Sequence, residues 1–351
     1  MRTLPTLAHL TIAAAILLLV GCAENGAPMS QHTAEQQRST GPSFPSMQVL
    51  PVTSNSTLLF SANGPRQLIY VDYFQNAPTT NIRVYDEKNP SHFVTKLGAR
   101  TLTVPEHMAV DGGGTVYVAN SQGPGNQGYG EIDAYAPGSN MPSKILKIPS
   151  PFFVYGVCVR SGILYAVTWG PTDSGPWPVY QFANGSKTPT STIYSYPTSY
   201  EPRACAVDSK GNLDVLYYNQ SSQASIDQFA PGSNTPQTLA ISLQNGEDIA
   251  VDASDNLLVS GNAPGGPFAV FVFAPGQTVP SASFDSGGNP WGFSLGSSGK
   301  NLYVIDVCAN PGCTQTHVLV YDYASGNLVG SFAADGKKHG SQFIAVTPRA
   351  P

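Results

Sequence analysis

The chain has 351 residues, of which 41% are hydrophobic, so it is long enough for one large closed domain or two ordinary ones. Only 11% of the residues are charged, whereas 35 are glycine and 30 are proline, a composition that favours short strands and tight turns over helices. The formal net charge of −5 and the lack of a Lys/Arg cluster argue against nucleic acid as a partner, because phosphate binding needs a basic face.

Residues 1–21 are predicted to be a secretory signal peptide. Arg2 is followed by the apolar run LTIAAAILLLV, which is too short and wrongly flanked for an ordinary membrane-spanning helix. The sequence Leu19-Val20-Gly21-Cys22 resembles the bacterial lipobox, and that resemblance implies cleavage before Cys22 and lipid on Cys22. Several acyl chains on one residue are enough for stable anchoring, at about 0.8 kcal/mol per buried CH₂. The other interpretation is ordinary secretion with an incidental cysteine.

The lipobox resemblance also implies a location. Position +2 is Ala23 rather than Asp, which in a Gram-negative host favours the outer membrane. Residues 22–55 are rich in Ser, Thr, Gln, Pro and Asn and are predicted to be a flexible tether. We therefore expect an extracytoplasmic protein, lipid-anchored to the cell envelope, whose folded part is residues 56–351.

One phrase recurs along the folded part. Residues 229–236 read FAPGSNTP, and near copies stand at 135–142 (YAPGSNMP), 182–189 (FANGSKTP) and 273–280 (FAPGQTVP). Proline sets φ near −65° and glycine accepts a positive φ, so the phrase predicts a turn between two strands. We interpret it as structural rather than as a ligand-contacting motif.

Apolar strands surround each copy of this phrase in the same order. In chain order the predicted strands are 68–74, 81–86 and 93–97; then 107–111, 116–120, 131–135 and 143–148; then 156–160, 164–169, 178–182 and 191–196; then 204–208, 213–218, 225–229 and 237–242; then 248–252, 257–262, 269–273 and 281–284; then 292–296, 302–307, 317–323 and 327–332. Equivalent aromatic residues recur at spacings of 47, 47, 44 and 50, namely Tyr135, Phe182, Phe229, Phe273 and Tyr323.

Self-similarity at 40–50 residues with four strands per unit indicates a β-propeller, in which neighbouring sheets cover each other's faces. The predicted fold is an all-β, six-bladed propeller with four-stranded antiparallel blades. The first unit lacks an inner strand. We expect the C-terminal segment QFIAVTP (342–348) to supply it and close the ring, in preference to TLLFS (57–61).

The repeated pattern of an apolar residue followed by Ala-Val-Asp, and then Gly-Asn-Leu-Tyr-Val, resembles NHL-repeat and related propeller proteins over residues 66–348. The resemblance implies the architecture far more than an activity. The repeated Asp at the strand end (Asp111, Asp208 and Asp252) is expected to accept N–H bonds from the following turn rather than to bind metal. Arg160 and Gly296 replace it in two units.

The residues that lead into the inner strands are expected to line the mouth of the central channel, where closed β architectures often bind ligands. The candidates are Glu106, His107, Tyr155, Glu201, Arg203, Glu247, Asp248, Asn289, Trp291 and His339. The alternative is that these polar groups only hydrate a narrow channel and cap strand ends.

Two enzyme classes fit the same residues. Gluconolactonase-type propellers hold a divalent metal through Glu, Asn and Asp, and Ca²⁺ prefers such oxygen ligands. The candidates here are Glu106, Glu201, Glu247, Asp248 and Asn289, and no local motif decides which of them would match. Streptogramin-lyase-like propellers use His and Glu, which His107 beside Glu106, or His339, could imitate, although adjacent strand residues face opposite ways. No nucleophile elbow, P-loop, H-E-x-x-H or C-x-x-C motif is present.

The remaining cysteines predict disulfides outside the cytoplasm. Cys308 and Cys313 flank ANPG and are expected to form a bridge that adds about 2 kcal/mol. Cys158 and Cys205 lie on neighbouring inner strands, where either a disulfide or two packed thiols would fit.

The function predicted from these features is a binding or scaffold module, monomeric, that contacts an envelope protein or a glycan through aromatic and glycine-rich loops at 120–130 and 169–178. No cofactor is expected for this role. The alternative is a metal-dependent lactonase or lyase, with Ca²⁺ at the channel mouth.

Overall fold

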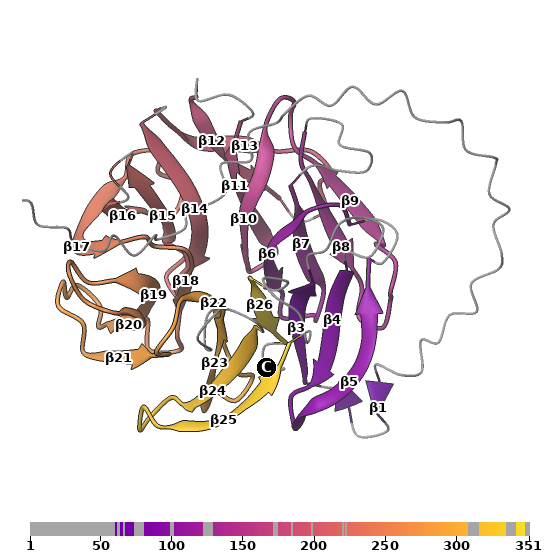
Figure 1. The fold of residues 1–351 in the computed structure, drawn as a ribbon. Helices are drawn as coiled ribbons and strands as arrows, with labels where there is room; N and C mark the ends of the chain where they lie inside the picture. The colour runs from indigo at the N-terminus through magenta and orange to yellow at the C-terminus, as the bar shows by residue number, and fades with distance from the viewer. Residues whose placement is uncertain are drawn as a thin grey trace, which may run out of the picture. The chain divides into compact units, whose positions relative to one another are not determined.

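The computed structural model describes residues 60–61, 64–65, 67–73, 81–98, 102–121, 129–170, 175–183, 185–197, 199–219, 221, 223–307, 316–334 and 342–347. All of them belong to the unit that runs from Thr53 to Pro351. Every regular element within these ranges is a β-strand (Figure 1). None of the described residues belongs to a helix that could cross a membrane. The predicted signal peptide, the lipid site at Cys22 and the tether lie outside the described residues.

Most strands form four-stranded antiparallel sheets. One sheet comprises β26 (Ile344–Val346), β3 (Leu68–Tyr73), β4 (Asn81–Asp86) and β5 (Asn89–Leu97). The next comprises β6 (Pro105–Val110), β7 (Val116–Asn120), β8 (Glu131–Tyr135) and β9 (Lys144–Lys147). A third comprises β10 (Phe153–Arg160), β11 (Ile163–Trp169), β12 (Trp177–Phe182) and β13 (Ser191–Tyr196). Another comprises β22 (Pro290–Leu295), β23 (Asn301–Asp306), β24 (His317–Asp322) and β25 (Leu328–Ala333).

The remaining strands depart from the prediction of separate blades. A single eight-stranded sheet contains β14 (Tyr200–Val207), β15 (Leu213–Asn219), β16 (Gln223–Phe229), β17 (Gln237–Gln244), β18 (Ile249–Val251), β19 (Leu257–Asn262), β20 (Phe268–Phe273) and β21 (Ala282–Asp285). Only the pair Gln244–Asn262 joins its two halves. The backbones can approach because Gly261 has no side chain: a Cβ there would lie 2.9 Å from the carbonyl oxygen of Gln244. The architecture is thus an all-β propeller with four-stranded antiparallel blades, in which one sheet has eight strands instead of four.

The C-terminal strand completes the first sheet, as expected from the sequence. In β26, Ile344 and Ala345 pair with Val71 and Tyr70 of β3. The competing N-terminal segment instead contributes β1 (Phe60–Ser61), which pairs with β2 (Gly64–Pro65) in a separate two-stranded sheet. The first sheet therefore combines three strands from the early part of the chain with the last described strand.

Neighbouring sheets bury each other's faces, which explains the continuous apolar runs in the sequence. All five residues of β8 are buried. One apolar cluster combines Ile82 and Leu97 of the first sheet with Met108 and Val118 of the second. Another combines Ile132 of the second sheet with Ala166 of the third. The stacking of blades that the repeat predicts is confirmed.

The recurring phrase forms the turn that its residues predict. Gly138, Gly232 and Gly276 have φ of 85°, 75° and 73°. The N–H group of the residue after each glycine donates to the carbonyl of the alanine three residues earlier, as Ser139 does to Ala136 at 2.9 Å. The preceding aromatics are fully enclosed: Tyr135 is only 1% exposed.

The repeated aspartates also behave as predicted. Oδ1 of Asp208 accepts hydrogen bonds from the N–H groups of Lys210 at 2.9 Å and Asn212 at 2.8 Å. Asp111 and Asp252 make the same pair of bonds two and four residues downstream. These carboxylates are occupied by turn backbone and serve to shape the turn.

Candidate functional site

Four inner strands carry a β-bulge at the same place, near the start of the strand. The ladder register shifts between Pro105 and Met108, Val154 and Gly156, Pro202 and Ala204, and Pro290 and Phe293. The residues inside the bulges are Glu106 and His107, Tyr155, Arg203, and Trp291 and Gly292. Because a bulge releases its residues from the regular alternation of the strand, it can redirect side chains at a site. Five of the ten predicted mouth residues are positioned in this way.

His107 and Asp248 form the most buried polar contact of this region. Nε2 of His107 lies 2.5 Å from Oδ1 of Asp248, and the two residues are 7% and 2% exposed. Burial disfavours the charged imidazole, but the charge and hydrogen bond of Asp248 outweigh burial and raise the pKa of His107. The pair joins β6 to the segment that leads into β18.

Asp248 connects further strands through the same carboxylate. Its Oδ1 accepts the N–H of Ile249 at 2.7 Å, and its Oδ2 accepts the N–H of Phe293 on β22 at 2.9 Å. The backbone N–H of Asp248 donates to the hydroxyl of Ser260, which in turn donates to the carbonyl of Trp291. This carboxylate is fully engaged, so its role is to hold three inner strands together.

Arg203 is the cation of the site. Its guanidinium contacts the carboxylate of Glu201 at 2.7 Å and lies 4.7 Å from the ring centre of Tyr155 and 4.1 Å from that of Tyr218. The side chain of Arg203 is 10% exposed, whereas that of Glu201 is 55% exposed. Glu201 therefore marks the solvent side of the site, and Arg203 lies behind it between two aromatic rings.

Glu106 and Glu247 are two acids whose pKa values are raised, although the charge of Arg203 acts on both. Burial, reinforced by Asp72 and by Glu247 and partly opposed by Arg203, raises the pKa of Glu106 to about 8. Burial, opposed by Arg203 but reinforced by Glu201 and Asp248, raises the pKa of Glu247 to about 7. The two glutamates are thus close enough to influence each other and share one guanidinium, so they change protonation near neutral pH.

Three predicted mouth residues lie elsewhere or cannot be placed. The backbone N–H of Asn289 donates a hydrogen bond to Oδ1 of Asp306 at 3.1 Å. Trp291 packs against the apolar cluster between the last and first sheets. His339 lies outside the described residues.

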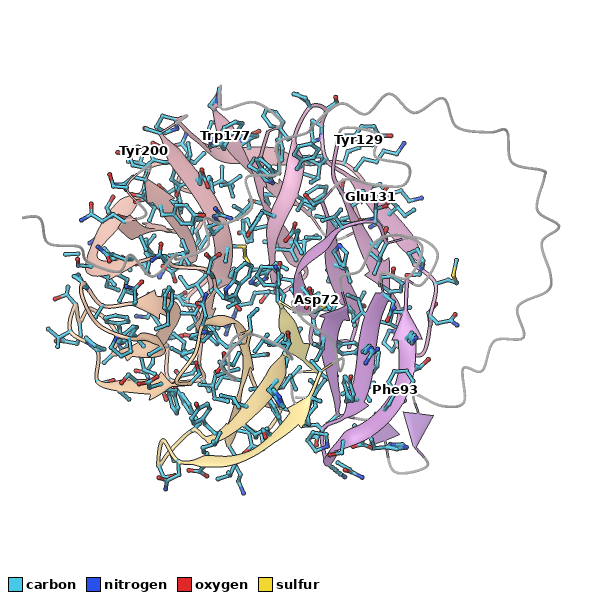
Figure 2. The ribbon with its side chains drawn as sticks, viewed as in Figure 1. Asp72, Phe93, Tyr129, Glu131, Trp177 and Tyr200 are labelled. Carbon is cyan, nitrogen blue, oxygen red and sulfur yellow. A yellow bond between two sulfur atoms is a disulfide. The ribbon has the colours of Figure 1, made fainter. Side chains whose placement is uncertain are left out.

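Two contributors were missed by the sequence analysis. Asp72, at the end of β3, accepts the N–H groups of Gln342 and Phe343 at 2.7 and 2.8 Å (Figure 2). The ring of Phe343 lies 5.2 Å from that of His107 and 6.2 Å from that of Tyr155. A signal for Asp72 was present, because Asn120 and Asp306 occupy the same strand-end position and cap their own inner strands in the same way.

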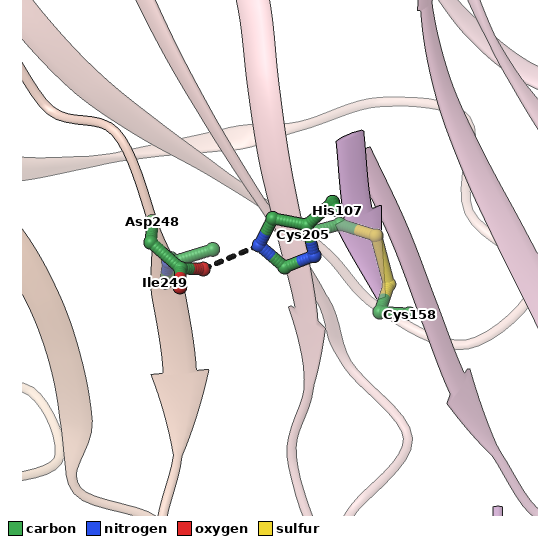
Figure 3. The surroundings of a disulfide bond; sticks show 5 residues. All are labelled: His107, Cys158, Cys205, Asp248 and Ile249. Atoms are coloured by element: carbon green, nitrogen blue, oxygen red, sulfur yellow. Dashed lines mark hydrogen bonds and ion pairs between the residues drawn. A yellow bond between two sulfur atoms is a disulfide. The ribbon is translucent and has the colours of Figure 1, made fainter. Parts of the chain in front are cut away.

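Cys158 and Cys205 form a disulfide beside these residues (Figure 3). Their Cα atoms are 5.6 Å apart, and the bond joins β10 to β14, the inner strands of neighbouring sheets. Of the two arrangements that the sequence left open, the structure contains the bridge. Cys308 and Cys313 lie outside the described residues.

Within the described ranges, no group of three or more His, Cys, Asp or Glu side chains is arranged to hold a metal ion. No family model matches the sequence, and no curated protein matches it.

Solved structures resemble the chain in fold. A protein of unknown function from Bacteroides caccae matches with a TM-score of 0.58 and 12% identity, over 80% of this chain and 99% of that one. TolB from Acinetobacter baumannii matches with a TM-score of 0.58 and 9% identity, over 81% and 67%. The β-propeller domain of Myceliophteria thermophila Cps50 (Swd1) matches with a TM-score of 0.50 and 11% identity, over 80% and 87%. At such identities the likeness concerns the fold alone, and that fold is the β-propeller.

Proposed function

We propose that this protein is a lipid-anchored, extracytoplasmic propeller of six blades that acts as a binding or scaffold module. The partner is an envelope protein or a glycan, bound at the channel mouth and the loops around it. Lipid on Cys22 would hold the module at the membrane surface, and the tether would let the propeller reach its partner.

The count of six treats the fused sheet as two blades, β14–β17 and β18–β21. Gln244 and Asn262 form the single strand pair described between these two halves, which supports this division. The order of inner-strand contacts supports a ring: β6 contacts β10, β10 contacts β14, β14 contacts β18, β22 contacts β26, and β26 contacts β6.

The observation that carries the binding role is the set of polar side chains on the inner-strand bulges. Glu106, Tyr155 and Arg203 come from three different strands, and with Glu247 they act on one another's charge. Bulged strands held by a disulfide and by the Asp248 hydrogen bonds form a rigid support, and a rigid scaffold that presents surface loops suits recognition. The disulfide also agrees with a compartment outside the cytoplasm.

Partner capture with matched charge variants tests this proposal. The tagged full-length chain is expressed in its lipidated form, and bound proteins and glycans are quantified after recovery from the membrane fraction. We expect a specific partner with the wild type, loss of that partner with Glu201→Lys, and no change with Asp285→Lys, an exposed acid outside the site. Identical recoveries for all three proteins would refute binding at the channel mouth.

Lipid attachment has its own readout. Metabolic labelling with palmitate should mark the wild type and not Cys22→Ser, and the variant should leave the membrane fraction. Equal labelling of both proteins would show that Cys22 is not the lipid site. The binding role would not be affected, because the capture experiment tests it separately.

The metal-dependent alternative rests on the acids that surround the axis. If Ca²⁺ binds the folded state there, it should raise the melting temperature in proportion to RT ln(1 + [Ca²⁺]/Kd), and Glu247→Gln should abolish that shift. An unchanged melting temperature up to millimolar Ca²⁺ would argue against this alternative.

A further inference from the structure

The exposed large apolar side chains are unevenly distributed around the ring. They lie on the strands β5, β9, β21 and β25 or in the turns that lead into them, whereas the strands β13 and β17 and the described parts of their turns carry none. Figure 1 shows β21, β25, β5 and β9 following one another along the periphery. Within the described ranges these side chains, here called the apolar rim, are Phe93, Met141, Ile145, Val279, Leu328 and Val329.

The recurring phrase shows that the fold does not require apolar residues at these places. Its seventh position is Met141 and Val279 in two copies but Thr188 and Thr235 in the other two, and the equivalent residue of the last unit is Val329. All five side chains are exposed, Val279 to 74% and Val329 to 59%. The glycine of the turn has a positive φ in every one of these units, so the turn forms with either residue type. An exposed valine where threonine also fits indicates a contact outside the fold.

The chain enters the propeller at the end of the blades that carries these turns. β3 begins at Leu68, which pairs with Asp86 beside the β4–β5 turn. The carboxylate of Glu87 in that turn accepts the N–H of Ser297 in the β22–β23 turn at 3.0 Å. The chain entry therefore lies next to the turns of the last sheet.

The same end of the molecule continues to the turn of Val279. In the β24–β25 turn, the hydroxyl of Tyr323 donates a hydrogen bond to Oδ2 of Asp252 in the β18–β19 turn at 2.9 Å. Leu257, directly after that second turn, pairs with Phe273, where a copy of the recurring phrase begins. Val279 therefore lies at the end where the chain enters, and the mouth residues, which precede the inner strands, lie at the other end.

A membrane is the partner that this position favours. Residues 23–67 separate Cys22, the proposed lipid site, from Leu68. A segment that ties this end to a bilayer raises the effective concentration of lipid at the rim, so weak apolar contacts suffice. Among the exposed charged side chains of the four outer strands and their turns, basic residues outnumber acidic ones, which suits anionic phospholipid headgroups. These side chains are Lys88, Lys96, Lys147 and Asp285.

We propose that the apolar rim docks on the surface of a phospholipid bilayer, and that the channel mouth then opens away from the membrane. This inference rests on the proposed lipid anchor at Cys22 and adds an orientation to it. The aliphatic side chains leave water for the boundary between headgroups and acyl chains, and the neighbouring lysines meet the headgroup phosphates. A partner in the envelope can then reach the mouth without competing with the membrane.

Quenching of added tryptophan fluorescence by brominated lipid tests the proposal. The lipidated full-length chain with Val279→Trp or Val329→Trp is reconstituted in vesicles of phosphatidylcholine and phosphatidylglycerol, with or without bromine on the acyl chains. The emission of the wild type, which has three tryptophans, is subtracted. We expect brominated vesicles to remove most of the added emission at both positions, because each side chain lies at the acyl boundary.

The repeat supplies matched controls. Thr188→Trp and Thr235→Trp place the same side chain at the same position of the turn, but on the blades without exposed apolar residues. Their added emission should be unchanged by bromine. Equal loss of emission at all four positions, or no loss at Val279→Trp and Val329→Trp, would overturn the proposal. Melting temperatures equal to that of the wild type confirm that the variants are folded, and Leu328→Trp, at a residue that is 57% exposed, is the substitute if one is not.

The outcomes also separate this inference from the proposed function. If Cys22 carries no lipid, a histidine tag in place of residues 1–21, bound to nickel-chelating lipid, replaces the anchor, and the same comparison decides. A chain that captures its partner but shows no quenching at the valines would refute the docked rim and leave the binding role intact. Quenching at the valines alone, in a chain that captures no partner, would support the docked rim and refute the binding role.

Discussion

Oε1 of Glu87 accepts a hydrogen bond from the N–H of Ser297 at 3.0 Å, across 210 positions of sequence. The same carboxylate oxygen of Glu87 lies beside Gly296, and a Cβ atom at Gly296 would be only 2.7 Å from it. Gly296 occupies the position that holds Asp111, Asp208 and Asp252 in other blades. The turn of the last blade is thus capped by an acid from the first blade, and the cap ties the two together.

Glu87→Ala should lower the free energy of unfolding by about 1–2 kcal/mol, because it leaves the N–H of buried Ser297 without its charged acceptor. Urea unfolding measures the loss. Adding Gly296→Asp to that variant should restore most of the stability by rebuilding the cap within the turn. If the double variant is no more stable than Glu87→Ala, an aspartate at position 296 does not replace the cap that Glu87 provides, and the proposed equivalence of the two acids is wrong.

Gly292→Ala should destabilise the protein by about 1–3 kcal/mol through overpacking. A Cβ at Gly292 would lie 2.5 Å from the carbonyl oxygen of Gln342 and 2.8 Å from Cα of Phe343, where β22 passes β26. Gly330→Ala on β25 is the matched control, because nothing lies within 4 Å of its Cβ position. Thermal unfolding of both variants compares them, and equal melting temperatures would contradict the close approach at Gly292.

Removing the disulfide with the double variant Cys158→Ser and Cys205→Ser should cost up to about 4 kcal/mol, the loop-entropy value for the sequence separation of 47. The midpoint of urea unfolding should fall, and reducing agent should lower the midpoint of the double variant less than that of the wild type. A wild-type protein whose unfolding midpoint is unchanged by reduction under denaturing conditions would show that the bridge contributes little.

Asp248→Asn should be most damaging at acidic pH. Because the pKa of His107 is raised above the ordinary histidine value of about 6.5, the folded state binds the proton more tightly than the unfolded state. The His107–Asp248 pair therefore stabilises the folded state fully below about pH 6.5, and this stabilisation is lost as the pH rises through the raised pKa of His107. Unfolding free energies of wild type and variant, measured at several pH values, should differ by about 3 kcal/mol at the acidic end. The difference should shrink as the pH rises, to the pH-independent cost of the backbone hydrogen bond that the asparagine amide cannot accept. A difference that grows with pH would have the wrong sign for this pair.

Local chemistry made the strands and turns predictable. The Ala-Pro-Gly turns and the aspartate-capped turns depend on contacts within three or four residues, so the sequence of each unit suffices to form them. The repeat spacing then required similar sheets that cover one another, and the C-terminal segment carried enough of the inner-strand pattern to be placed in the first blade.

The arrangement of the site was less accessible to sequence reasoning. Strict alternation would put Glu106 and His107 on opposite faces, yet Glu106 is acted on by Glu247 while His107 contacts Asp248, its neighbour in the chain. The bulge between Pro105 and Met108 accounts for this, because it interrupts the alternation at that point. No pattern in the sequence marked the bulge.

By itself, the sequence determined the all-β character, the four-stranded unit and the turns, because these follow from short-range backbone preferences repeated along the chain. Only the tertiary structure decided that Gln244 and Asn262 pair within one eight-stranded sheet, that Cys158 and Cys205 are bridged, and that His107 and Asp248 meet across 141 positions. Such contacts depend on the register of each strand and on how closely backbones approach, and these are set by the packing of whole sheets rather than by any single segment.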